Sequence, residues 1–128
     1  MATIKSYSDL QQSKKLAEFL PLESADMFHF IHEVDTVGFG YKKEAAEFYS
    51  KTEFEYLPCW SLASLLGVLP QFIEFKGDKY YLRFMKDYVE YANDEVSITG
   101  RCLHTTGNDN LVDACYEMII RLNKLNLL

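Results

Sequence analysis

The sequence has few of the residues that mark special classes of protein. Its 128 residues include three prolines, six glycines and three cysteines, which excludes collagen-like and disulfide-framework proteins. No CxxC pair occurs, so a cysteine-rich zinc site has no support. Residues 1–20 contain no continuous apolar run, and we therefore expect neither a signal peptide nor a membrane anchor. The formal charge of −6 has the wrong sign for a phosphate-binding surface, so no nucleic-acid partner is expected.

What remains is the composition of an ordinary globular protein. Hydrophobic residues make up 48% of the chain and charged residues 25%, which suits one domain over residues 1–128. Cys59, Cys102 and Cys115 each stand beside an apolar residue. We interpret them as buried thiols, and an odd number of unpaired cysteines favours a reducing compartment, the cytoplasm.

The first half of the chain predicts helices around an ambiguous stretch. Ser8-Asp9-Leu10-Gln11 forms a capping box with Ser8 as the N-cap, and good helix formers continue to Leu20 before Pro21. Residues 24–34 fit either a helix or a strand, and their aromatic and β-branched residues favour the strand. Gly38-Phe39-Gly40 indicates a turn, and residues 43–49 a short helix.

A Leu-rich helix follows Pro58, with Ser61 as its cap. Its apolar face carries leucines at helical spacing: Leu62, Leu65, Leu66 and Leu69.

The period then changes from 3.6 to 2 residues, as expected for an antiparallel meander of about four strands. Turns at Lys76-Gly77-Asp78-Lys79 and Lys86-Asp87 separate the first strands, and residues 96–103, with Val96 and Ile98 on one face, predict the fourth.

The strongest helix prediction lies at the carboxyl end, where Asn110 is the N-cap. Its apolar stripe comprises Leu111, Val112, Cys115, Met118, Ile119 and Leu122. The sequence therefore predicts an α+β fold, in which this helix and the Leu-rich helix cover one face of the meander and an N-terminal helix precedes them.

Several short motifs carry a resemblance to a known family. They are Gln12-Ser13-Lys14-Lys15-Leu16, Ser24-Ala25-Asp26-Met27, Pro58-Cys59-Trp60-Ser61-Leu62 with Leu65-Leu66, and Asn110 with Val112-Asp113-Ala114-Cys115 and Met118-Ile119. In this order they resemble a family of small uncharacterised proteins of bacteriophages and prophage-like elements of gut bacteria. The resemblance spans most of the chain except residues 32–52. It implies a mobile-element protein and no reaction, cofactor or catalytic residue.

Cys59 is the one weak candidate for catalysis. A thiol at a helix N-terminus can be activated, but it needs a base, and only His29, His32 and His104 could serve. The alternative is a buried Cys59 beside Trp60, which we favour.

Metal binding is disfavoured by the preferred strand. His29 and His32 would share one face of a helix, but an odd offset places them on opposite faces of a strand. We therefore expect no metal and no other cofactor.

We expect a non-enzymatic protein-interaction module encoded by a phage or mobile element. Aromatic residues make up 15% of the chain, and Tyr81, Tyr88 and Arg83 fall where an exposed sheet face would form an interaction surface. The partner is another protein or a second copy of the chain. The alternative is a small thiol-dependent or hydrolytic enzyme that uses Cys59 with a distant histidine.

Overall fold

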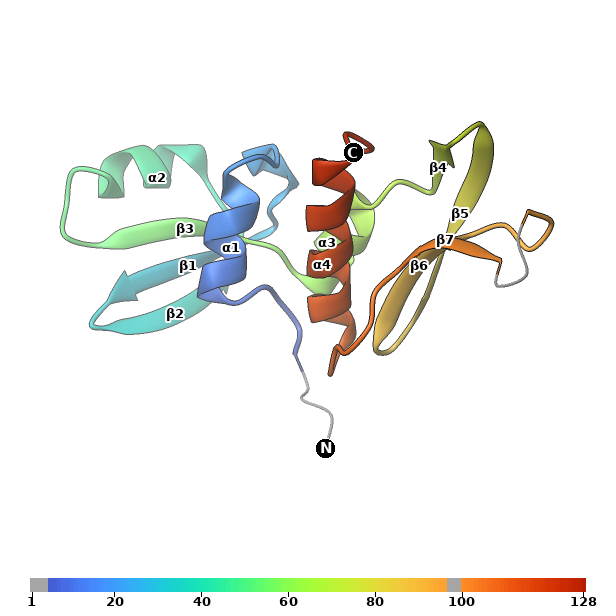
Figure 1. Cartoon of the computed structure of the whole chain (residues 1–128). Helices are drawn as coiled ribbons and strands as arrows, with labels where there is room; N and C mark the ends of the chain where they lie inside the picture. Colours follow the sequence, from blue (N-terminus) through green and yellow to red (C-terminus); the bar gives the residue numbers. More distant parts are fainter. Residues whose placement is uncertain (1–4, 97–99) are drawn as a thin grey trace. The chain divides into compact units, whose positions relative to one another are not determined.

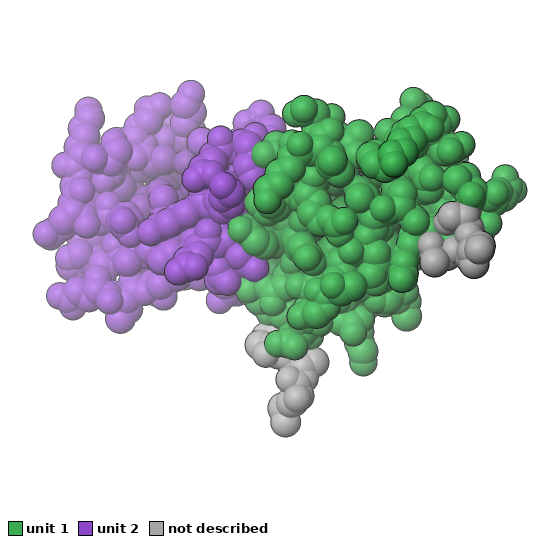
Figure 2. Space-filling view, viewed as in Figure 1, with its two compact units in different colours: residues 1–5, 65–128 green, residues 6–64 purple. Residues whose placement is uncertain are grey.

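The computed structural model describes residues 5–96 and 100–128. Over these residues the protein has an α+β fold, as predicted, with four α-helices and two antiparallel sheets (Figure 1). The four-stranded sheet is the predicted meander, and the three-stranded sheet was not predicted. The chain divides into two compact units, unit 1 comprising residues 1–5 and 65–128 and unit 2 residues 6–64 (Figure 2). The single domain over residues 1–128 stays a prediction.

Unit 2 is a three-stranded sheet with two helices. Its sheet has the strand order β2-β1-β3, antiparallel throughout. The elements are α1 (Leu10–Ala17), the 3-10 turn η1 (Leu22–Ser24), β1 (Met27–His32), β2 (Val34–Phe39), α2 (Lys43–Tyr49) and β3 (Glu55–Cys59).

The central strand β1 explains why the two helices lie on opposite faces of this sheet. Alternate side chains of a strand point to opposite faces, and His29 contacts Ser13 of α1 whereas Phe30 packs against Tyr49 of α2. The ambiguous stretch is thus a strand from Met27 to His32, as favoured.

The predicted turn at Gly38-Phe39-Gly40 is wrong for its first two residues, which belong to β2. Gly38 pairs with Phe28 across the strands. A Cβ at residue 38 would lie 2.5 Å from Cζ of Phe28, so glycine is there because the aromatic ring lies across its backbone. Gly40, with φ of 83°, makes the bend that follows.

The N-terminal helix begins one residue later than predicted. Asp9, not Ser8, is the N-cap, and it forms a capping box with Gln12: each side chain bonds the other residue's backbone N–H. The helix ends at Ala17 rather than Leu20. Ser8 is fully buried instead and bonds elsewhere.

Residues before α1 pair with residues before and at the start of α3 (Leu62–Val68). The Ser8 N–H donates to the Trp60 carbonyl at 2.8 Å, and the Leu62 N–H donates to the Ser6 carbonyl at 2.9 Å. The two ends of unit 2 are therefore hydrogen-bonded to each other. Ser61 caps α3 by accepting from the Ser64 N–H, as predicted.

Unit 1 contains the predicted meander, with strand order β4-β5-β6-β7. The strands are β4 (Phe72–Phe75), β5 (Asp78–Met85), β6 (Tyr88–Ala92) and β7 (Arg101–His104). Lys76 and Gly77 both have positive φ, the geometry of a two-residue hairpin turn. The predicted fourth strand is wrong at Val96, which lies in a turn, and β7 begins only at Arg101. The predicted alternation at Ser97, Ile98 and Thr99 lies outside the described residues.

The carboxyl-terminal helix α4 (Leu111–Lys124) packs on one face of this meander, against β6. Asn110 caps it by accepting from the Asp113 N–H at 2.9 Å. Its buried side chains are Val112, Ala114, Cys115, Met118, Ile119 and Leu122. The boundary between the units falls within α3, so the packing of that helix on the meander stays a prediction.

Candidate functional site

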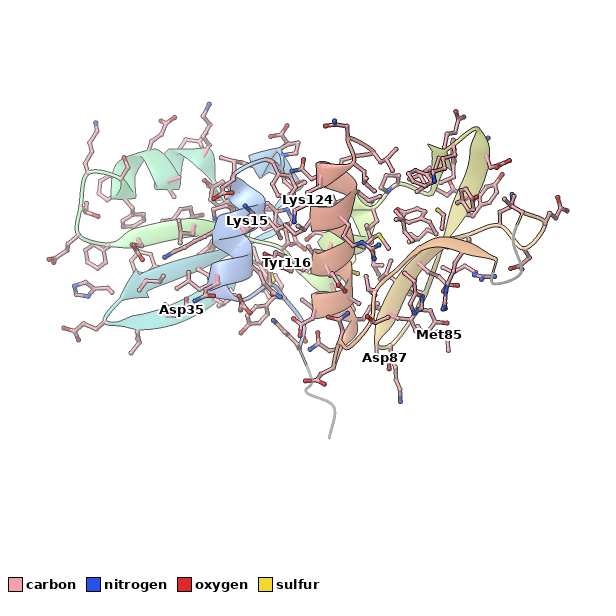
Figure 3. The ribbon with its side chains drawn as sticks, in the orientation of Figure 1. Lys15, Asp35, Met85, Asp87, Tyr116 and Lys124 are labelled. Carbon is pink, nitrogen blue, oxygen red and sulfur yellow. The ribbon has the colours of Figure 1, made fainter. Side chains whose placement is uncertain are left out.

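A buried polar cluster in unit 2 gathers side chains that are far apart in the sequence. His29 of β1 is 1% exposed, and its Nδ1 lies 3.0 Å from an oxygen of Asp35 on β2; Figure 3 labels this aspartate. Its Nε2 lies 3.1 Å from both the Ser8 carbonyl and the Ser13 hydroxyl of α1. Cys59 of β3 completes the cluster, with its sulfur 3.4 Å from the same Ser8 carbonyl.

The strand register explains how Cys59 and His29 meet. Cys59 pairs with Met27, and Leu57 pairs with His29, so Cys59 and His29 are diagonal neighbours on the same face of the sheet. The sequence left three histidines open as partners for this thiol, and the structure places His29 beside it.

The contacts of His29 favour the charged form of its ring. The Asp35 carboxylate and the Ser8 carbonyl only accept hydrogen bonds, so a proton on each ring nitrogen satisfies both, while the Ser13 hydroxyl can either accept from Nε2 or donate to it. Burial opposes the charge, but the hydrogen bond and the charge interaction with Cys59, together with the hydrogen bonds to Asp35 and the Ser8 carbonyl, outweigh burial and raise the pKa of His29 to about 9.

This geometry argues against a catalytic Cys59 or Ser13. Cys59 is 0% exposed and Ser13 is 1% exposed, so a substrate in solution does not reach them. The cluster is suited to holding α1 and residues 6–8 against the sheet.

The other histidines are in different surroundings. His32 lies on the opposite face of β1, where it stacks on Phe54 and approaches Glu53 at 3.5 Å. His104 belongs to unit 1 and bonds Glu90. Over residues 5–96 and 100–128, no group of three His, Cys, Asp or Glu side chains could hold a metal ion.

The cysteines are free, and two of the three are fully buried. Burial raises the pKa of Cys115 to about 12, so this thiol is inert at neutral pH. Cys102 is only half-buried, which corrects the prediction that all three are buried, and burial raises its pKa as well.

The predicted interaction residues Tyr81, Arg83 and Tyr88 share one face of the β4–β7 sheet. Tyr91 of β6 lies beside Cys115 of α4, and Tyr88 is an odd number of residues away, so it points to the other face. Tyr81 and Arg83 have the same orientation because Tyr81 pairs with Ala92, and Arg83 with Glu90. We call this side, away from α4, the outer face.

Exposed apolar side chains frame the outer face. Tyr81 is 49% exposed and Met85 58%; Met85 lies at the β5–β6 end of the sheet (Figure 3). Phe72 pairs with Tyr81, its ring centroid 6.2 Å away. The Lys79 ammonium lies 4.3 Å from the Phe72 ring in a cation–π contact.

Glu90 organises the centre of this face and was not singled out in the sequence. It is 5% exposed and accepts hydrogen bonds from Arg83 at 2.7 and 2.8 Å and from His104 at 2.8 Å. Arg101 is 3.9 Å away. A buried carboxylate held by several cations fixes the arginine side chain in one orientation.

Comparison with protein-family models, with curated proteins and with solved structures finds no match. The resemblance to phage proteins therefore has no support beyond the motifs themselves. Among the helices described in Figure 1, none is long and apolar enough to cross a membrane.

Proposed function

We propose that this chain is a non-enzymatic protein-binding module that recognises its partner through the outer face of the β4–β7 sheet. One observation carries the proposal: Phe72, Tyr81 and Met85 are 43–58% exposed on a single sheet face. Clustered exposed apolar side chains mark interaction sites. Tyrosine, methionine and arginine are also the residues enriched where proteins meet.

Arg83 supplies the polar part of this surface. Because Glu90 and Asp94 hold the guanidinium in place, the side chain loses little conformational freedom when a partner binds. Arg83 is still 45% exposed and can donate hydrogen bonds to a partner's carboxylate or carbonyl oxygen. Tyr88, stacked on His104 at 5.0 Å, extends the same face.

A second copy of the chain is the simplest partner, because an isologous two-fold dimer needs only one self-complementary surface. The motifs shared with phage proteins support an origin on a mobile element, and the three free cysteines support a place in the cytoplasm.

Sedimentation velocity over a wide concentration range tests self-association. Tyr81→Ala should weaken a dimer by about tenfold or more, as expected for a central aromatic contact. Phe48→Ala is the matched control, because Phe48 is an aromatic residue even more open to solvent than Tyr81, at 66% against 49%, but lies on α2. Equal weakening by both variants would refute the outer face as the interface.

If the wild type is a strict monomer at high concentration, self-association is excluded and the partner must be another protein. Affinity capture from host lysate with wild type, Tyr81→Ala and Phe48→Ala then tests whether another protein binds the outer face. The proposal requires a protein that the Tyr81→Ala variant loses and the Phe48→Ala variant retains. Identical captured sets from all three would overturn it.

A further inference from the structure

Unit 2 has a groove of a different kind, on the face of its sheet that carries α2. Its volume is about 410 Å³, within the usual range for small-molecule sites. The side chains that shape it are mainly aromatic: Phe28, Phe30, Phe39, Tyr49, Tyr56 and the cation Lys42. We call it the aromatic groove.

The rings of the aromatic groove contact one another and form a continuous wall. Phe28 and Tyr56 have centroids 5.0 Å apart, Tyr49 and Tyr56 stack at 5.8 Å, and Phe30 meets Tyr49 edge-on at 5.0 Å. Each ring is therefore restrained by its neighbours. A wall of restrained π-systems favours a flat aromatic ligand that can stack on it.

The position of Phe28 depends on the strand beside it. Gly38 on β2 has no side chain and therefore leaves room for the Phe28 ring; a Cβ at residue 38 would collide with this ring. The floor of the groove is thus set by the backbone of the sheet.

The polar groups of the groove favour a negative charge on the ligand. Lys42 is the one charged side chain among its described lining residues, and no carboxylate within residues 5–96 and 100–128 forms a salt bridge with it. The Tyr56 hydroxyl accepts the Lys42 backbone N–H at 2.9 Å. Among the described residues, no group accepts the proton of the Tyr56 hydroxyl, so this hydroxyl can donate it to a ligand.

We propose that the aromatic groove binds a small planar aromatic acid. The rings of Tyr49 and Tyr56 are stacked on each other, and Tyr56 is also stacked on Tyr41. The aromatic part of the ligand therefore packs on Phe39, the lining ring that is 82% exposed. The carboxylate binds the Lys42 ammonium and accepts the Tyr56 hydroxyl proton. This site lies in unit 2 and is independent of the protein-binding role assigned to the outer face of unit 1.

Binding of 2-naphthoate tests the proposal, with 2-naphthamide as a neutral probe of the same shape. Each is titrated into ¹⁵N-labelled full-length protein, and the amide shifts give both the affinity and the location. Because the ligand is small and the groove open, we expect a dissociation constant in the millimolar range. Shifts should concentrate in β1, residues 39–49 and β3, which carry the lining residues. 2-Naphthamide should bind about fivefold more weakly, the effect of one solvent-exposed charge pair.

Two lysine variants separate the site from general attraction of an anion. Lys42→Met keeps an apolar stem but removes the charge, and it should abolish the preference for 2-naphthoate over 2-naphthamide. Lys43→Met is the matched control, since Lys43 lines a different hollow with Leu22 and Tyr41. The spectra of both variants also show whether they fold.

Three results would overturn the proposal. One is equal affinity for the acid and the amide in the wild type. Another is the same loss of preference in Lys43→Met as in Lys42→Met. The third is a set of shifts that lies outside β1, residues 39–49 and β3, or no shifts at all up to about 10 mM, where a millimolar ligand saturates.

Discussion

Removing the proton from His29 should loosen unit 2, because the ring then loses one of its charge-assisted hydrogen bonds. Above the pKa of His29, one ring nitrogen has a lone pair that faces either the Asp35 carboxylate or the Ser8 carbonyl. Neither of these oxygens can donate to it, and although the Ser13 hydroxyl can donate to Nε2, the hydrogen bond and the charge interaction of the protonated ring are lost. We therefore predict that the free energy of unfolding falls in alkaline solution.

The direction and size of this change in the free energy of unfolding follow from the pKa of His29 in the folded and in the unfolded protein. The folded value is about 9, raised from the ordinary 6.5 of an unfolded histidine. The stabilisation is thus fully present below pH 6.5 and is lost as the pH rises through 9. A difference of this size corresponds to about 3 kcal/mol.

Urea unfolding between pH 6 and 10 measures the effect, with fluorescence of the single, fully buried Trp60 as the signal. His29→Gln is the reference, because groups away from His29 titrate alike in both proteins and cancel in the difference. Cys59 interacts with His29, so the difference reports His29 together with this contact. The stability gap between wild type and variant should shrink by about 3 kcal/mol across this range. A gap that stays constant would mean that His29 is neutral in the native protein, and the reasoning above would be wrong.

Three further predictions concern other parts of the structure. Gly38→Ala should lower the free energy of unfolding by about 1–3 kcal/mol, seen in the urea midpoint, because its Cβ meets Phe28; an unchanged midpoint would contradict this. Glu90→Gln should lower it by about 1–2 kcal/mol, measured by thermal unfolding, since the carboxylate pairs with Arg83 and hydrogen-bonds His104. A thiol reagent should label Cys102 in the native protein but Cys59 only after unfolding; rapid labelling of Cys59 at neutral pH would restore it as a nucleophile.

The elements predicted well from the sequence are those whose signal is local. The stripe from Val112 to Leu122 repeats at helical spacing, and its cap Asn110 stands immediately before it. The hairpin around Gly77 combines alternating residues with a turn residue that tolerates positive φ. In each case the information lies within a few residues of the element.

The first strands of unit 2 were harder because their pattern depends on both faces being covered. Residues 34–39 and 55–59 do not alternate clearly between apolar and polar, and β2 is largely exposed. Gly38 suggested a turn, although its role is to receive Phe28 from the neighbouring strand. That role is visible only when the register is known.

The buried cluster could not be predicted for the same reason. Ser8 looked like a helix cap, and Asp35 stood in a stretch without assigned structure. Only the pairing of β1 with β2 and β3, together with the packing of α1, brings these groups to His29. The sequence did identify Cys59 and the histidines as the side chains to follow, but not which of the three would meet the thiol.

The hydrogen bond between Ser6 and Leu62 has a consequence for protein engineering. Unit 2 is one continuous stretch of chain between the two segments of unit 1. Because its two ends are hydrogen-bonded to each other, unit 2 has the topology of an inserted domain. A short peptide could span the gap left by its excision, and its own termini could be joined to make a circular permutant. Unit 2 inserted into another protein would bring the aromatic groove with it, without unit 1.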